Sequence, residues 1–242
     1  MRFCFLMLCA LSFTGCDKEP VTEDTLITRG RELFRSLQFS SDGKTSCVTC
    51  HPEGHTDNRN WHFAAIHDTT AGIPDSFRTI TLWGIAQTGS PYLWKNSFRS
   101  LESVTRLYTD TIMGGTASED EVAALVAYQR SLAFPKNPNL ADNGQLTEAQ
   151  ARGKSIYEDP NRGNCAPCHP APTYGSPIPK NIYTGGTFRT VGLRGLYSIA
   201  PYFHNGSAKT LHEVIEHYAG NGLIAPLTAQ ERDDLVEYLK TL

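Results

Sequence analysis

The sequence contains Cys47-Val48-Thr49-Cys50-His51 and, in its second half, Cys165-Ala166-Pro167-Cys168-His169. Both pentapeptides have the form C-x-x-C-H, the attachment motif of c-type heme. Two thiols one helical turn apart can add to the two vinyl groups of a porphyrin, and the adjacent imidazole then lies under the ring as an iron ligand. The sequence therefore predicts two covalently bound hemes c, with His51 and His169 as the proximal iron ligands.

Three other roles for the paired cysteines explain the pattern less well. A redox-active dithiol needs no histidine beside it. A zinc site can use four cysteines, but residues 51–164 separate the two pairs, unlike the ligands of a compact zinc module. Disulfide bonds between the pairs would leave both histidines unexplained. Heme attachment at Cys47, Cys50, Cys165 and Cys168 is therefore the expectation.

The composition restricts the class of protein further. The chain has 242 residues, 40% of them apolar, and a formal net charge of −3. This charge argues against a polybasic nucleic-acid binder, and the apolar content argues against a disordered chain. A chain of this length fits one or two domains. We expect no nucleic-acid partner.

The N-terminus has the layout of an export signal. Arg2 precedes an apolar stretch that ends at Phe13, and the small residues before Cys16 resemble a bacterial lipobox. Residues 1–15 are the expected signal peptide and 16–27 the expected tether, with a lipid on Cys16 that anchors the protein on the periplasmic side of a bacterial membrane. An ordinary signal peptide cleaved elsewhere is the alternative. Lipidation would leave no odd thiol in the mature chain.

The heme motifs belong to an internal repeat. Each copy carries an Arg-Gly pair before the motif, an Arg-Thr segment and a Pro-Tyr segment after it, and a similar C-terminal stretch. The matching segments are Arg29-Gly30 and Arg152-Gly153, Arg78–Gly84 and Arg189–Gly195, Pro91–Trp94 and Pro201–His204, and 118–132 and 228–242. We predict an all-α protein of two tandem cytochrome c-like heme domains with long loops, at 28–135 and 148–242, joined by a linker at 136–147.

Helix start signals place the same elements in each copy. A short helix follows the Arg-Gly pair and leads to the heme motif. A second helix is expected to start near Leu101 in the first copy and near Leu211 in the second. The last helix is expected to be capped by Ser118 or Thr228, each followed three residues later by a glutamate, as in a capping box.

With these motifs and Pro201-Tyr202-Phe203-His204-Asn205-Gly206-Ser207, the chain resembles the bacterial diheme cytochrome c peroxidases. Their superfamily includes the methylamine-utilisation diheme enzyme. The resemblance covers Thr28 to Leu242. It implies two hemes close enough for electron transfer, one supplying electrons and one reacting with hydrogen peroxide. It also implies a small cytochrome or cupredoxin as electron donor and a calcium ion between the domains, whose ligands the sequence does not identify.

The distal ligand of the first heme has one methionine candidate. Met113 lies just before the last helix of the first copy, where small cytochromes c place their methionine ligand, and it is the only methionine after the signal peptide. A core methionine is the structural alternative. The peroxidases take a switchable histidine ligand from the region after the first motif, where this chain has His55, His62 and His67.

The second copy has no methionine, and Tyr218 is its main candidate for the distal position. Leu211, Val214, Ile215 and Tyr218 recur with helical spacing, which puts Tyr218 on the inward face. The methylamine-utilisation enzyme has an iron-bound tyrosine at the matching position. The alternatives are a core tyrosine bonded to a propionate or carbonyl, as expected for its repeat partner Tyr108, and ligation by His204 or His217.

The sequence departs from the peroxidases near the first heme. They carry a Trp-Asp-Gly-Arg segment followed by a catalytic glutamate. This chain has Trp94-Lys95-Asn96-Ser97, and Ser103 takes the place of the glutamate, next to Glu102. Trp94 is either an electron-transfer residue between the hemes or a packing residue. Three hypotheses follow: a peroxidase-like oxidoreductase, a non-catalytic electron-transfer cytochrome, and a high-valent heme oxidase of another substrate. No catalytic residue is assigned.

Overall fold

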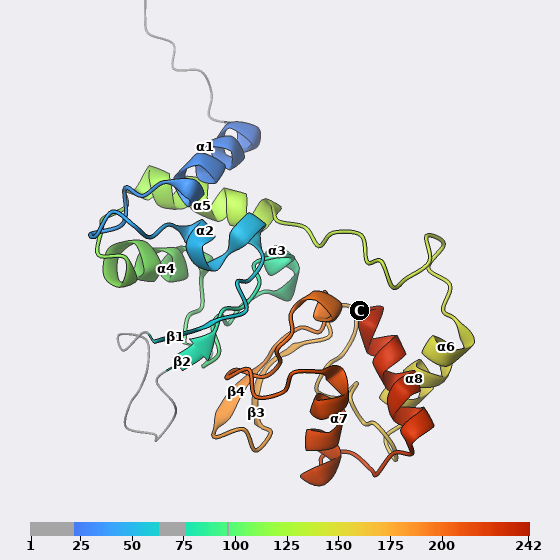
Figure 1. Cartoon of the computed structure of the whole chain (residues 1–242). Coiled ribbons are helices and arrows are strands. Elements are labelled where there is room, and N and C mark those ends of the chain that lie inside the picture. The colour runs from blue at the N-terminus through green and yellow to red at the C-terminus, as the bar shows by residue number, and fades with distance from the viewer. Residues whose placement is uncertain (1–21, 63–75, 96) are drawn as a thin grey trace, which may run out of the picture.

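The computed structural model describes residues 22–62, 76–95 and 97–242, which form two halves (Figure 1). The N-terminal half contains α1 (Glu23–Arg35), α2 (Cys47–Cys50), a 3₁₀ turn (Pro52–Gly54), α3 (Ile85–Thr88), α4 (Leu101–Arg106), a π-helical turn (Leu107–Ile112) and α5 (Glu119–Ser131). The C-terminal half contains α6 (Glu148–Glu158), α7 (Leu211–Gly220) and α8 (Ala229–Lys240). None of the described helices is long and apolar enough to cross a membrane.

Each half is built on the crossing of its first and last helices. A Cβ atom on Gly30 of α1 would lie 2.0 Å from the carbonyl oxygen of Ala124 in α5, and one on Gly153 of α6 would lie 2.0 Å from that of Asp234 in α8. Only glycine permits so close an approach of two backbones. Equivalent aromatic pairs pack beside the two glycines, Phe34–Tyr128 at 5.1 Å and Tyr157–Tyr238 at 5.3 Å between ring centroids.

The later helix starts of each half are confirmed, but the first helix does not follow the Arg-Gly pair as predicted: α1 and α6 begin at Glu23 and Glu148 and contain the pair. Ser118 and Thr228 cap α5 and α8 with complete capping boxes, in which the glutamate three residues on accepts a hydrogen bond from the N–H of the cap. The second helix of each half begins at Leu101 or at Leu211, after a serine or threonine cap. These local signals therefore fix the elements that carry the distal side of each candidate heme site.

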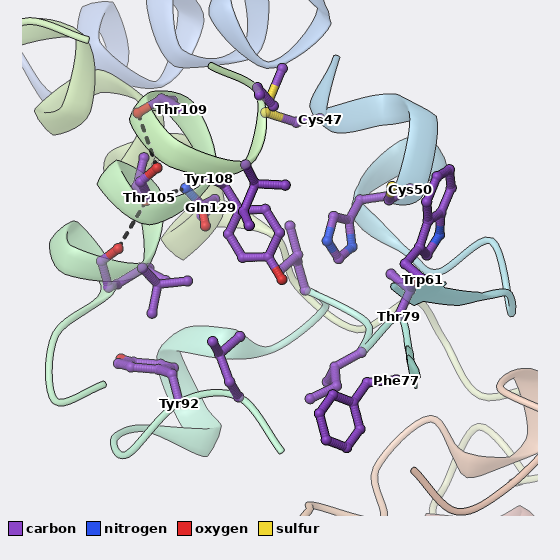
Figure 2. Close-up of a pocket in the computed structure, with 18 of the residues that line it drawn as sticks. Cys47, Cys50, Trp61, Phe77, Thr79, Tyr92, Thr105, Tyr108, Thr109 and Gln129 are labelled. Carbon is purple, nitrogen blue, oxygen red and sulfur yellow. Dashed lines mark hydrogen bonds between the residues drawn. The ribbon is translucent and has the colours of Figure 1, made fainter. Parts of the chain in front are cut away.

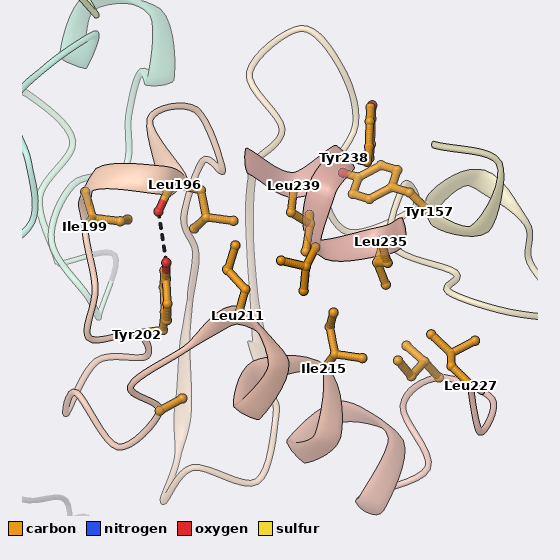
Figure 3. Close-up of a cluster of buried hydrophobic side chains, with 13 residues drawn as sticks. Tyr157, Leu196, Ile199, Tyr202, Leu211, Ile215, Leu227, Leu235, Tyr238 and Leu239 are labelled. Carbon is orange, nitrogen blue, oxygen red and sulfur yellow. Dashed lines mark hydrogen bonds between the residues drawn. The ribbon is translucent and has the colours of Figure 1, made fainter. Parts of the chain in front are cut away.

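Each half has its own hydrophobic core. That of the C-terminal half is formed by side chains from α6, α7, α8 and the loops between them, as Figure 3 shows. A smaller third cluster lies between the halves: Phe77 and Trp94 from the first half pack with Phe188 from the second. The halves are therefore joined by an apolar contact as well as by the linker.

The interface between the halves has approximate two-fold symmetry. The N–H of Arg78 donates a hydrogen bond to the carbonyl of His204, and the N–H of Arg189 donates one to the carbonyl of Trp94, both at 2.7 Å. Arg78 matches Arg189 in the repeat, and Trp94 matches His204. Each bond is therefore the repeat equivalent of the other.

The side chains of the same two arginines also form equivalent hydrogen bonds across the interface. The guanidinium of Arg78 donates to the carbonyl of Ile199 at 2.6 Å, and that of Arg189 donates to the carbonyl of Gly89 at 3.0 Å. Phe134, at the start of the connection to α6, packs against Gly84 of the first half and the equivalent Gly195 of the second.

The fold differs from the all-α expectation in two short antiparallel sheets, β1 (Asn60–His62) with β2 (Ser76–Arg78), and β3 (Ser176–Asn181) with β4 (Thr187–Thr190). Strands of three to six residues leave too little alternation in the sequence to be recognised. The expected tether also ends early. Thr22 forms a capping box with Thr25, so α1 begins at Glu23, and residues 23–27 belong to the N-terminal half. Residues 1–21, including Cys16, lie outside the described residues.

Candidate heme-binding sites

The two C-x-x-C-H motifs have the same local geometry. In α2 the N–H of His51 donates to the carbonyl of Cys47 at 2.9 Å, and in the second half the N–H of His169 donates to the carbonyl of Cys165 at 2.9 Å. Ser46 caps α2 reciprocally with Thr49. Each turn thus brings an imidazole next to the two thiols of its motif.

The rings of both histidines are oriented for metal binding. The Nδ1–H of His51 donates to the carbonyl of His55 at 3.0 Å, and that of His169 donates to the carbonyl of Tyr174 at 2.8 Å. This fixes the tautomer and leaves Nε2 with a lone pair for iron. Burial lowers the pKa of both imidazoles, which favours the neutral form that ligates a metal.

The thiols do not have the properties of a redox-active dithiol. Burial raises the pKa of Cys47, of Cys50 and of Cys165 to about 12, whereas a reactive dithiol needs a readily formed thiolate. The two motifs lie in different halves, and no group of three or more histidine, cysteine or acidic side chains that could hold a metal ion occurs among residues 22–62, 76–95 and 97–242. The zinc alternative therefore finds no support in the described chain.

A cavity of about 480 Å³ lies beside the first motif and is lined by Cys47, Cys50 and His51. Tyr108 and Met113 also line it, on the side of α4 and the π-helical turn. Figure 2 shows the ring of Tyr108 projecting among the lining residues. The structure therefore gathers in one cavity the attachment cysteines, the proximal histidine and the methionine proposed from the sequence.

Met113 is held at the cavity by its backbone. The side chain is buried, its N–H donates to the carbonyl of Tyr108 at 2.8 Å, and its carbonyl accepts from the N–H of Ser41 at 2.8 Å. In the C-terminal half, Leu223 makes the equivalent bond to Tyr218 at 2.9 Å. The two halves thus form the same backbone hydrogen bond at this position, but only the first half has a sulfur-containing side chain there.

The wall of the cavity also has polar groups that can donate hydrogen bonds to the propionates of heme. The hydroxyl of Thr79 and the Nε–H of Arg189 are buried and have no hydrogen-bond partner among the described residues, and both residues line the cavity. A buried polar group without a partner is costly, so a carboxylate at this position would be stabilising. The residues present therefore fit heme c.

In the C-terminal half, Tyr218 lies next to the second motif. Burial raises the pKa of this phenol, and the neighbouring thiols of Cys165 and Cys168 raise it further. The ring of Phe203 is stacked 6.3 Å from that of Tyr218. The phenol is therefore protonated at neutral pH in this environment, and a nearby cation is needed to hold it as a phenolate.

Comparison with known proteins agrees with this geometry. Residues 150–242 match the family model for cytochrome c. The chain is 28% identical to the gamma subunit of hydrazine synthase from Kuenenia stuttgartiensis, over 93% of this chain and 80% of the relative. It is 23% identical to the methylamine utilization protein MauG of Methylophilus methylotrophus, over 89% and 81%. It is 21% identical to the cytochrome-c peroxidase IdrP1 of Denitromonas iodatirespirans, over 92% and 82%.

Solved structures show the same fold. A chain of Kuenenia stuttgartiensis hydrazine synthase superposes with a TM-score of 0.74, covering 100% of this chain and 99% of that one at 24% identity. A MauG-like protein associated with microbial copper homeostasis gives a TM-score of 0.70, covering 93% and 90%, also at 24% identity. Over most of its length the chain is therefore similar to MauG, to a cytochrome-c peroxidase and to a subunit of hydrazine synthase. Together with the cytochrome c match, these relatives support heme c as the cofactor and oxidoreduction as the class of chemistry.

The histidines that the resemblance to the diheme peroxidases suggested as distal ligands are not equally placed. His55 bonds through its two ring nitrogens to Thr81 at 3.0 Å and to the carbonyl of Ser198 at 3.2 Å, and it stacks on Trp83. It does not line the cavity, whereas the exposed His62 does. His67 lies outside the described residues.

In the second half, Nε2 of His217 is 2.6 Å from the carbonyl of Ile182, so this nitrogen is engaged in a hydrogen bond. His204 is only 2% exposed, and neither of its nitrogens has a partner in the described chain. Its ring stacks on Phe188 at 3.8 Å. Burial, with a contribution from Lys95, lowers the pKa of His204 to about 4.

Trp94 lies at the interface between the two halves. It is buried, lines the cavity of the first half, and its indole N–H donates to the carbonyl of Arg78 at 2.7 Å. Its ring lies 6.3 Å from that of His204 in the second half. The structure therefore places Trp94 both at the cavity and at the interface.

Neither Glu102 nor Ser103 is directed at the cavity of the first half. Glu102 forms an ion pair with Arg130 at 3.2 Å on the surface, and the hydroxyl of Ser103 bonds within its own turn. Neither residue lines the cavity, whose one described carboxylate is Asp42. Sequence reasoning missed Thr79 and Arg189, although the repeated Arg-Thr segment is the signal that contains both.

Proposed function

We propose that this protein is an exported diheme c-type cytochrome that resembles the cytochrome c peroxidases in activity. A small cytochrome or cupredoxin supplies two electrons, and hydrogen peroxide takes them up with two protons to give two molecules of water. The observation that carries the proposal is the pair of equivalent C-x-x-C-H turns, in each of which the Nδ1–H of the histidine donates to a carbonyl and leaves Nε2 free for iron. The two turns belong to halves joined through Trp94 and His204.

The two halves have different roles in this proposal. Heme c, when bound, supplies an iron that exchanges electrons and reduces peroxide where one axial face is accessible. Cys47, Cys50 and His51 hold the heme of the first half, and Cys165, Cys168 and His169 hold that of the second. We assign Met113 and Tyr218 as the distal ligands. A phenolate from Tyr218 donates charge to iron and stabilises its oxidised states, which suits a site of permanent ligation.

Peroxide access is assigned to the first half. Met113 lines its cavity of about 480 Å³. This residue would be an uncharged ligand, and it lies directly after the π-helical turn and before two glycines. With heme held here, Met113 would be the residue that has to move before peroxide could reach the iron. No carboxylate takes the position of the peroxidase glutamate, because Glu102 pairs with Arg130 on the surface. The proton needed for O–O cleavage then comes from water or from a hydroxyl of the cavity wall.

The location and partners extend this proposal. Export through residues 1–15 and a lipid on Cys16 would hold the protein on the periplasmic side of a membrane, where the donor protein reaches it. We also propose a calcium ion between the halves, on the basis of the resemblance to the diheme peroxidases. Since the formal net charge is −3, nucleic acid is not among the proposed partners.

The test is spectroscopic and kinetic. The EPR spectrum of the fully ferric protein is recorded, one electron per molecule is added, and peroxide reduction is then assayed with a donor cytochrome. Appearance of a high-spin heme on half-reduction together with turnover supports the proposal. Two low-spin hemes that half-reduction leaves unchanged, with no turnover, would contradict it and leave an electron-transfer cytochrome, the function favoured by the outward position of Glu102.

A further inference from the structure

The cavity beside the first heme motif is cationic on the side that faces the other half. Arg78, Lys95 and Arg189 line it. Arg78 binds carbonyls of the second half, Lys95 lies 5.2 Å from the ring of Phe188, and Arg189 belongs to the second half itself. The described carboxylate of the wall, Asp42, is bonded to Ser40 and to the backbone of Lys44 before α2. The interface side therefore carries positive charge without an anion.

Arg189 is positioned to reach into this cavity from the other half. It follows Phe188 in β4, and its terminal NH2 group is fixed by the carbonyls of Thr88 and Gly89 in the first half, at 3.3 and 3.0 Å. Its guanidinium carbon lies 6.0 Å from the ring centre of Tyr92. The terminal contacts hold the guanidinium in place, yet its Nε–H is buried and has no partner among the described residues.

The same wall of the cavity has a second buried donor that lacks a partner. It is the side-chain hydroxyl of Thr79, which has no hydrogen-bond partner in the described structure. Burial lowers the pKa of Arg189, the direction expected of a cation that no nearby carboxylate compensates. A carboxylate that accepts from Arg189 and Thr79 would satisfy two buried donors and one buried charge.

The chemistry of heme c says which carboxylate this is. The vinyl groups that receive the thiols and the two propionates lie on opposite edges of the porphyrin. When Cys47 and Cys50 hold the vinyl edge, the propionates therefore point away from the thiols. In the view of Figure 2, Cys47 lies at the top of the cavity, and Thr79, Phe77 and Tyr92 lie in its lower part, with Tyr92 across from Thr79. Arg189 reaches the same lower part at Tyr92.

We propose that Arg189 and Thr79 form a carboxylate-binding site for a propionate of the heme attached to Cys47 and Cys50. The C-terminal half thereby completes the heme site of the N-terminal half, and Arg189 is a positioning residue that acts across the interface. The inference rests on the proposed diheme function, since it needs heme at the first motif.

The test compares four variants of the full, heme-loaded protein, the fourth being Arg189→Lys. Arg189→Gln and Thr79→Val each remove one donor. Arg194→Gln is the matched control, because Arg194 also bonds across the interface, to Gln87 at 3.2 Å, but does not line the cavity. The readouts are covalent heme content by mass, the midpoint potential of each heme, and the resonance Raman bending modes of the propionates.

Arg189→Gln is expected to lower the equilibrium constant for reduction of one heme roughly tenfold, since loss of a cation favours the ferric state and a charged hydrogen bond contributes about 1.5 kcal/mol or more. Thr79→Val is expected to shift the same heme in the same direction by less, and the two effects are expected not to add. Arg194→Gln is expected to shift neither heme. Arg189→Lys, which keeps the charge but loses Nε–H, should restore part of the potential without restoring the Raman mode.

The outcomes separate this inference from the proposed function. Wild-type protein without covalent heme overturns both. Two hemes with potentials and propionate modes unaffected by Arg189→Gln overturn the inference alone. So does a result in which Thr79→Val and Arg189→Gln affect different hemes, or in which Arg194→Gln has the same effect as Arg189→Gln. If Arg189→Gln does not fold, Thr79→Val and Arg189→Lys give the same comparison.

Discussion

Gly153 lies where α6 crosses α8, and a methyl group there would meet the carbonyl oxygen of Asp234 at 2.0 Å. We expect Gly153→Ala to lower the free energy of unfolding by about 3 kcal/mol, because the helices must separate to admit the side chain. Gly220, at the end of α7, has open space around it, so Gly220→Ala should change stability by less than about 1 kcal/mol. Urea unfolding of the heme-loaded proteins measures both, and equal effects would contradict the close-approach explanation.

The two proposed distal ligands of the heme irons lead to a separate prediction. Met113→Ala should alter the visible and EPR spectrum of one heme, and Tyr218→Phe that of the other, since each replaces a proposed iron ligand. Leu223→Ala is the control, because Leu223 occupies the position of Met113 in the second half without offering a ligand atom. A spectrum that does not respond to a substitution would remove that residue as a ligand.

At the scale of elements, α6 and α8 are joined by an ion pair that the other half lacks. Arg152 donates two hydrogen bonds to the carboxylate of Asp234, at 2.7 and 2.8 Å, and the Asp234 side chain is only 4% exposed. The equivalent residue of α5 is Ala124. The bond from Arg152 holds the pKa of Asp234 below its usual value of 3.8.

This pair predicts a pH dependence. Because the pKa of Asp234 is lower in the folded state, the stabilisation is present above about pH 4 and is lost as the pH falls through the folded pKa. Asp234→Asn should cost about 1.5–3 kcal/mol at pH 7, the range of one charged hydrogen bond, and the difference from wild type should shrink in acid. Urea midpoints at pH 7 and pH 3 test this, and an equal loss at both would rule out the titration of Asp234 as its source.

The elements also show what local sequence can and cannot predict. Ser118 and Thr228 predicted two helix starts because a capping box is a contact within four residues. The hairpins were missed because strands of three to six residues carry too little alternation of polar and apolar residues to be recognised. The π-helical turn was also missed, because no local residue pattern distinguishes it from the α-helix that Tyr218 occupies in the other half.

For the whole molecule, the repeat predicted two similar halves, and the C-x-x-C-H motifs predicted the residues around the first cavity. The packing of the halves was not predictable, because Arg78 and Arg189 donate to backbone carbonyls, which every residue possesses. The contribution of Arg189 to the cavity of the other half follows from that packing. Sequence alone could therefore predict the attachment residues, but not which residues of the other half line the cavity beside them.

Phe134 tests how the halves are held together. Its ring packs against Gly84 and Gly195, and the guanidinium of Arg194 lies 5.3 Å from the ring centre. We expect Phe134→Ala to lower the free energy of unfolding by about 2 kcal/mol, less than for a fully buried phenylalanine. Tyr183→Ala, which truncates a side chain that is 61% exposed, should have little effect. Equal urea midpoints for the two variants would show that Phe134 does not stabilise the contact.

The matched pair of main-chain bonds, from Arg78 to His204 and from Arg189 to Trp94, has the form of an isologous contact, in which one patch meets its own copy. A single ancestral unit bearing this patch would have paired with its twin as a homodimer. Fusion through residues 136–147 makes that pairing independent of protein concentration. It also lets each copy diversify separately, so that Met113 can arise in one while Leu223 remains in the other.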